Sequence, residues 1–139
     1  GHAYALGPGT TTRAIAERLG LLKTLVGVDV VRDGASLTAD ANEAQLLALA
    51  QSGALTIVVA PTGGQGFLFG RGNQPFSPRV LAAVGVANIV VVATAAKLAA
   101  LGGRPLQVDT GDPALDAQLA GPIRVITGYQ ERAVYRVEG

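Results

Sequence analysis

Three short apolar runs without polar alternation constrain the fold of this chain more than any other feature of its sequence. They read TLVGVDVV, TIVVA and IVVVA, at residues 24–31, 56–60 and 89–93. A strand with one face in water alternates apolar and polar residues, whereas a strand covered on both faces is apolar throughout. The runs therefore predict a parallel sheet with helices on both sides.

Helical patterns alternate with these and other strand-like runs along the chain. The predicted strands are Ala3–Leu6, Leu25–Val31, Leu55–Ala60, Ile89–Ala93, Leu106–Val108, Arg124–Thr127 and Ala133–Val137. The predicted helices are Thr11–Leu19, Asn42–Ala50, Pro78–Val84, Ala95–Leu101 and Pro113–Leu119, the last with Asp112 as its N-cap. Such alternation predicts an α/β fold, a three-layer α/β/α sandwich with a mostly parallel sheet. The last two strands, separated by residues 128–132, predict a C-terminal β-hairpin.

Composition narrows the classes of function. The chain has 139 residues, 49% of them hydrophobic, which predicts a single domain over residues 1–139. Its net charge of +1 gives no electrostatic basis for binding nucleic acid or a membrane surface. Cysteine is absent, and the only histidine, His2, follows Gly1 in what we interpret as a tag remnant, so we expect no metal site. The absence of methionine and of a targeting pattern indicates part of a longer, cytoplasmic protein.

A Gly-Pro-Gly turn followed by three threonines connects the first predicted strand to the first predicted helix. Gly7 and Gly9 let the backbone approach a ligand, and Thr10, Thr11 and Thr12 offer hydroxyl and N–H groups at a helix N-terminus. This arrangement favours a phosphate or carboxylate site. The alternative is a tight turn with a threonine N-cap, which needs only one threonine and one glycine.

A glycine- and proline-rich stretch, PTGGQGFLFGRGNQPFSP, follows the strand Leu55–Ala60. It begins at the carboxyl edge of the predicted sheet, where open α/β sheets bind ligands. The residues that we expect to contact a ligand there are Gly63, Gly64, Gln65, Gly66, Arg71 and Asn73, with Arg71 able to fork onto a phosphate. The alternative is an ordered loop anchored by its two internal phenylalanines, with Arg71 paired to a local acid.

Three further positions carry charge next to predicted strands. Asp29 lies within an apolar run, so it either contacts a ligand or accepts hydrogen bonds from neighbouring loop N–H groups. Lys97 lies in the first turns of a helix, where its charge opposes the dipole unless a ligand, Asp109 or Asp112 offsets it. We interpret Asp109 and Asp112 as solvated residues of a helix cap.

Together these motifs resemble a known family. LGPGTTTRAIAERLGL, GGQGFLFGRGNQPFSPRV, RPLQVDTGD and VITGY are similar to the C-terminal region of ATP-NAD kinase-like proteins, which include the acetoin-catabolism protein X group. In that family an N-terminal domain carries a Gly-Gly-Asp-Gly motif for the phosphates of NAD and ATP, and this tetrapeptide is absent here. The resemblance implies a C-terminal domain that holds no cofactor itself. Its partner would be the N-terminal kinase domain of a parent protein that uses ATP to phosphorylate NAD and so makes NADP.

A more distant likeness concerns the fold. The Gly-x-Gly-Thr-Thr loop, the glycine-rich loop and the IVVVAT run with its lysine look like the superfold of ribose-5-phosphate isomerases, glucosamine-6-phosphate deaminases and CoA-transferases. By this likeness Gly7 to Thr12 would hold a phosphate, Lys97 would assist, and the loop from Gly63 to Asn73 would close over the ligand. The acidic cluster of the isomerases is reduced here to Asp29 and Asp33.

Three hypotheses follow. We favour a domain that binds a phosphorylated small molecule or nucleotide through the glycine, threonine, arginine and lysine residues above. The second is a stand-alone enzyme acting on a sugar phosphate or CoA ester, with Asp29 or Asp109 as general base. The third is an oligomerisation module whose apolar helices pair between protomers, and we expect a homo-oligomer.

Overall fold

The computed structural model describes residues 2–18, 20–21, 23–24, 27–70, 73–128 and 131–139. Within this part of the chain there are nine strands and five α-helices. The strands are β1 (Ala3–Leu6), β2 (Asp29–Arg32), β3 (Ala35–Thr38), β4 (Leu55–Val59), β5 (Phe67–Phe69), β6 (Ile89–Val92), β7 (Leu106–Val108), β8 (Gly121–Gly128) and β9 (Glu131–Glu138). The helices are α1 (Thr10–Arg18), α2 (Glu43–Gln51), α3 (Pro78–Val84), α4 (Ala95–Ala100) and α5 (Pro113–Leu119), with a short 3₁₀ turn η1 (Val86–Asn88).

All nine strands belong to one mixed sheet with the order β3-β2-β1-β4-β6-β8-β9-β7-β5. The central strands β1, β4, β6 and β8 run parallel, as do β9, β7 and β5. Antiparallel pairs join β1 to β2, β2 to β3, and β8 to β9. The predicted α/β fold, mostly parallel sheet and C-terminal hairpin are confirmed.

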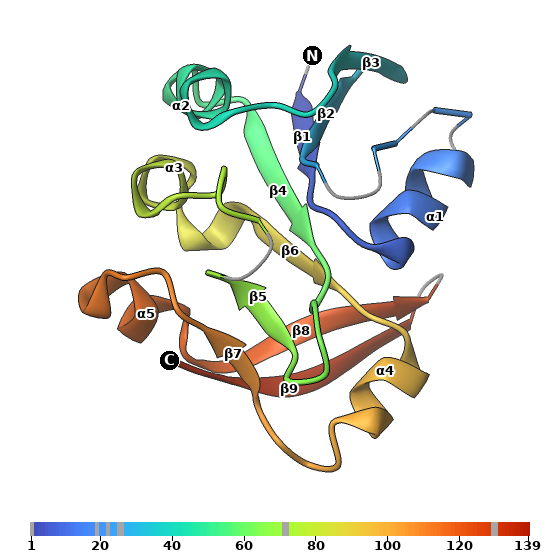
Figure 1. The fold of residues 1–139 in the computed structure, drawn as a ribbon, viewed down its shortest axis with the longest axis vertical. Coiled ribbons are helices and arrows are strands. Elements are labelled where there is room, and N and C mark those ends of the chain that lie inside the picture. Colours follow the sequence, from blue (N-terminus) through green and yellow to red (C-terminus); the bar gives the residue numbers. More distant parts are fainter. Residues whose placement is uncertain (1, 19, 22, 25–26, 71–72, 129–130) are drawn as a thin grey trace.

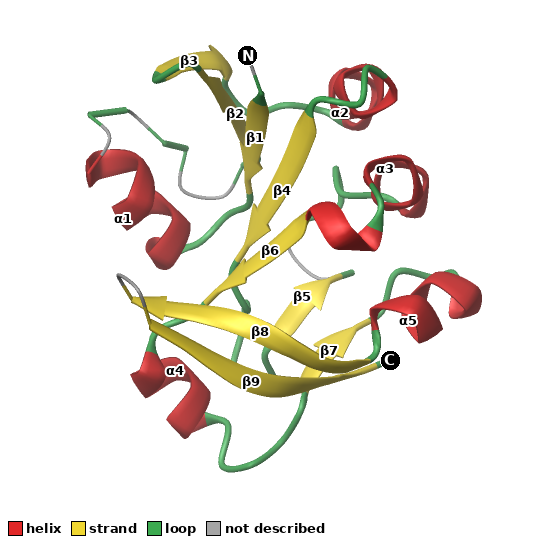
Figure 2. Ribbon diagram, turned by 180° about the vertical axis from the view of Figure 1, so that it is seen from behind, coloured by secondary structure: helices red, strands yellow, loops and turns green. Residues whose placement is uncertain are grey.

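Helices cover both sides of the sheet. Figures 1 and 2 show α2, α3 and α5 on one side and α1 and α4 on the other. The connections from β1 to β4 and from β4 to β6 are crossovers between parallel strands, which require a segment that passes over a sheet face. This connectivity produces the three layers that the continuous apolar runs predicted.

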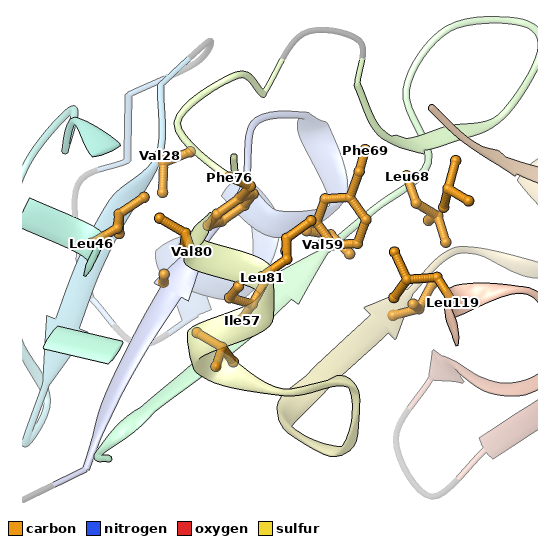
Figure 3. Packing of buried hydrophobic residues seen from close by; sticks show 14 of the residues in the cluster. Val28, Leu46, Ile57, Val59, Leu68, Phe69, Phe76, Val80, Leu81 and Leu119 are labelled. Atoms are coloured by element: carbon orange, nitrogen blue, oxygen red, sulfur yellow. The ribbon is translucent and has the colours of Figure 1, made fainter. Parts of the chain in front are cut away.

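The main core lies between the sheet and the helices α2, α3 and α5. Figure 3 shows Val80 and Leu81 of α3 beside Ile57 and Val59 of β4, and these four side chains are fully buried. The opposite side is thinner, because α1 packs Ala16 onto a small cluster that includes Leu6 and Val31. The sheet face under α2, α3 and α5 is therefore tightly packed, whereas the face under α1 carries a smaller buried cluster.

Two strands were not predicted, and one predicted strand pairs differently. β3 completes a hairpin whose turn, Asp33-Gly34, has positive φ at both residues, as a type I′ turn requires. β2 begins only at Asp29, and residues 25–26 of the predicted strand lie outside the described part. β2 is antiparallel to β1 although its apolar sequence suggested a parallel strand, because hydrophobicity reports coverage of the faces and not strand direction.

Helix starts follow the sequence closely. Asp112 caps α5 as predicted, accepting hydrogen bonds from the N–H groups of Ala114 and Leu115, and Pro113 is the first helical residue. Asn42, predicted as the first residue of its helix, is instead the N-cap of α2 in a capping box with Gln45. No helix in the described ranges is long and apolar enough to cross a membrane.

Candidate functional site

A cleft of about 600 Å³ lies at the carboxyl ends of β1, β4 and β6. Three connections form its walls: residues 9–11 before and within α1, residues 60–63 after β4, and residues 93, 94, 96 and 97 between β6 and α4. In Figure 1 these strand ends point toward the region between α1 and α4. Parallel strands leave their carboxyl ends at one edge, so three separate loops converge there.

The three threonines at the start of α1 have different roles. Thr12 is fully buried, and its hydroxyl donates to the carbonyl oxygens of Gly7 at 2.6 Å and Gly9 at 3.1 Å. Thr10 and Thr11 line the cleft instead. The first turn of an α-helix also leaves N–H groups without intrahelical acceptors. The cleft wall formed by Thr10 and Thr11 thus offers hydroxyl and N–H donors.

The two glycines of this turn differ in position. Gly7 is buried outside the cleft, and a Cβ there would lie 3.3 Å from the Phe76 ring. Gly9 has a φ of +120° and lines the cleft, and a Cβ at this position would have no heavy atom within 4 Å. Gly7 therefore serves packing, whereas Gly9 sets the backbone direction at the cleft wall.

The glycine-rich stretch forms a closed turn and then a strand. Thr62 and Phe67 exchange two backbone hydrogen bonds, of 2.8 and 3.0 Å, across residues 63–66. Gly63 and Gly66 have φ values of +71° and +72°, and Gly66 packs so closely that a Cβ would lie 3.0 Å from Leu101. Gly63 lines the cleft, while the exposed Gly64 and Gln65 form the tip of the turn outside it.

Lys97 connects this turn to α4. Its Nζ donates to the Gly63 carbonyl oxygen at 2.7 Å, and its backbone N–H donates to the Thr94 hydroxyl that caps the helix. Among the described residues no carboxylate lies within ion-pair distance of Lys97. Asp112, one of its two expected partners, caps α5. The half-buried Lys97 side chain therefore places an unneutralised positive charge in the cleft wall.

Asp29 lies outside this cleft, in a buried ion pair. Lys23 Nζ lies 3.1 Å from its carboxylate, and the side chains are 0% and 3% exposed. The carboxylate also accepts hydrogen bonds from the N–H groups of Thr24 and Asp40, as in the loop alternative above. Burial raises the pKa of Asp29, but the hydrogen bonds from Asp40, Lys23 and Thr24 outweigh it and hold that pKa below its ordinary value.

The described residues in the second half of the glycine-rich stretch also lie away from the cleft. Asn73 is 2% exposed, and its Nδ2 donates to the Leu68 carbonyl oxygen at 2.7 Å, which ties the loop to β5. Phe69 is buried against Phe76 with ring centroids 6.0 Å apart. Arg71 lies outside the described residues.

The cleft thus brings together five of the predicted site residues. These are Gly9, Thr10, Thr11, Gly63 and Lys97. Sequence reasoning did not include Thr62 or Thr94, which also line it. Each lies within two residues of the end of an apolar run, TIVVA-PT and IVVVA-T. A hydroxyl residue directly after a buried strand was the signal that could have identified them.

Comparison with known proteins identifies the family. The sequence model described as the ATP-NAD kinase C-terminal domain matches residues 1–137. Neither the comparison with curated proteins nor the comparison with solved structures found a match. Because the match covers almost the whole chain, this protein belongs to the ATP-NAD kinase C-terminal domain family.

Proposed function

We propose that this domain binds a phosphorylated small molecule or nucleotide in the cleft formed by the β1, β4 and β6 connections. The observation that carries the proposal is the position of Lys97, a cation without an acidic partner in the described residues, in the same cleft as Thr10 and Thr11. Hydroxyl groups, helix N-terminal N–H groups and an ammonium group are the donors that phosphate oxygens accept.

A binding role fits this cleft better than a stand-alone enzyme does. No acidic residue among the described ones lines it. The two candidate bases lie elsewhere: Asp29 is held in the buried ion pair with Lys23, and Asp109 follows β7. A general base must come within hydrogen-bond reach of the substrate. The domain would therefore supply binding to a longer cytoplasmic protein whose N-terminal domain carries out ATP-dependent phosphorylation of NAD.

Calorimetric titration tests the proposal. The purified chain is titrated with NAD, NADP, ATP and sugar phosphates, beside Lys97→Gln, which removes the charge at similar length. Arg79→Gln is the matched control, since it removes one exposed charge from α3 on the other side of the sheet. We expect saturable binding that Lys97→Gln weakens by about tenfold or more, equal to about 1.4 kcal/mol.

The proposal also predicts which substitutions should leave ligand binding unchanged. Arg79→Gln should bind like the original chain, and an Arg71→Ala variant reports separately on the second half of the glycine-rich stretch. Absence of binding by every ligand, or equal weakening by Lys97→Gln and Arg79→Gln, would contradict the proposed site.

A further inference from the structure

A second cleft, of about 370 Å³, adjoins the first one on the α1 side of the sheet. The two share Thr11, Ala93 and Thr94 in their walls, so they lie directly next to each other. The second cleft extends from these residues along α1 to Arg18. With a rise of about 1.5 Å per residue, Arg18 lies about 10 Å beyond Thr11 along the helix.

The chemistry of the second cleft differs from that of the first. Its floor contains Val92 and Ile126, which are paired in the register of β6 and β8, and Ile15 of α1 forms a side. Ile15 and Ile126 are only half-buried, because the buried residue Ala16 of α1 packs with Leu6 and Val31 instead. Apolar surface thus remains open to a ligand directly beside the donors of Thr11 and Thr94.

We propose that the second cleft holds the apolar body of the ligand whose phosphate lies in the first. This inference rests on the proposed function and narrows its ligand to an organic phosphate that carries an aromatic ring or an aliphatic group. Binding pockets typically combine mostly apolar walls with a few convergent polar groups, and the two adjacent clefts together have this composition.

The same geometry disfavours a small polyol phosphate. Hydroxyl groups that lie against Ile15, Val92 and Ile126 would find no side-chain hydrogen-bond partner, and burying an unpaired hydroxyl is costly. Besides the two threonines shared with the first cleft, the described polar side chains that line this one are Arg18 and Thr127. An apolar group placed against the three apolar residues would instead gain the free energy of removing apolar surface from water.

Three probes separate the two clefts by calorimetry. Inorganic phosphate reports on the first cleft alone, glycerol 3-phosphate adds a polar body, and 1-naphthyl phosphate adds an apolar ring. We expect the Kd of 1-naphthyl phosphate to be lower than that of the other two probes by about tenfold or more, since apolar contacts in a pocket change the affinity for related ligands by such factors.

A pair of variants tests the assignment to Ile126. Ile126→Thr removes apolar surface while keeping a β-branched residue that suits a strand, and Val134→Thr is the matched control on the neighbouring strand β9. Val134 is 72% exposed and does not line either cleft. Ile126→Thr should weaken 1-naphthyl phosphate about fivefold and leave inorganic phosphate unchanged. Thermal unfolding confirms that both variants are folded.

The outcomes distinguish this inference from the proposed function. If none of the three probes binds, the proposed function fails and the inference fails with it. If the phosphates bind but the naphthyl group adds no affinity, or Ile126→Thr has no selective effect, the inference alone is overturned. It is also overturned if 1-naphthol binds as tightly as 1-naphthyl phosphate, because the two clefts would then not share one ligand.

Discussion

The ammonium group of Lys97 donates to the carbonyl oxygen of Gly63 at 2.7 Å and so links the first turn of α4 to the glycine-rich turn after β4. The two residues are 34 positions apart in the sequence and meet because β4 and β6 are adjacent parallel strands. This contact joins two of the three loops that form the cleft and holds a positive charge there.

Replacing Lys97 with methionine should loosen that turn without unfolding the protein. The side chain keeps its apolar length but loses the donor to Gly63, while the Thr62–Phe67 backbone pair remains. We expect faster amide hydrogen exchange at residues 63–66 and a global stability change below about 1 kcal/mol, the net value of one exposed hydrogen bond. Exchange in the distant helix α5 serves as the internal reference, and unchanged exchange at residues 63–66 would contradict the link.

Thr12 and Thr11 should separate stability from binding. Thr12→Val leaves the carbonyl oxygens of Gly7 and Gly9 without their hydroxyl donor in a buried turn, which should cost about 1–3 kcal/mol of unfolding free energy. Thr12→Ser keeps the donor and should recover most of this loss. Thr11→Val should weaken phosphate binding but leave the denaturant midpoint nearly unchanged. The hypothesis fails if Thr11→Val destabilises the chain as much as Thr12→Val does.

Near β2, we expect the largest losses of unfolding free energy from substitutions in the buried ion pair of Lys23 and Asp29. Asp29→Asn leaves the buried Lys23 ammonium without its counter-charge, and breaking such a pair costs about 3–5 kcal/mol. A Lys23→Met/Asp29→Leu double variant removes both charges and should be less destabilised than Asp29→Asn. Urea unfolding measures this difference. A double-mutant cycle of Lys23→Met, Asp29→Leu and the double variant gives the coupling energy, and additive losses would contradict coupling between the two residues.

The same carboxylate predicts an acid-dependent loss of stability. Because the pKa of Asp29 is lower in the folded chain than its ordinary value, its contribution is complete above the unfolded pKa, about 3.9, and is lost as the pH falls through the folded pKa. The Asp29→Leu variant should therefore show a flatter decline in unfolding free energy below about pH 4. An unchanged slope would assign the acid sensitivity to other carboxylates.

Replacing two glycines of one turn with alanine should have different effects on stability. Gly66→Ala forces a Cβ onto a residue with a φ of +72° and to within 3.0 Å of Leu101, so we expect a loss of about 1–2 kcal/mol. Gly64 has open space around it and no positive φ, so Gly64→Ala should be neutral or slightly stabilising. Thermal unfolding of both variants checks this contrast, and equal losses would contradict a conformational role specific to Gly66.

The layers, the direction of the central strands and most element bounds could be predicted from the sequence. Runs such as IVVVA report that both faces of a strand are covered, and Asp112-Pro113 marks a helix start through local hydrogen bonding alone. β3 and β5 were missed because each is short and lies next to glycines. Such segments become strands only when a neighbouring strand, here β2 or β7, supplies the hydrogen bonds.

For the candidate site, the sequence is enough to identify which loops follow buried strands and which donors they carry, because strand and loop patterns are local. Which of these donors meet depends on the fold. It brought Thr10, Thr11 and Lys97 to one cleft and turned Thr12 inward. It also placed Asp29 in an ion pair with Lys23. Strand order and side-chain burial decide these outcomes, and both depend on contacts between residues far apart in the chain.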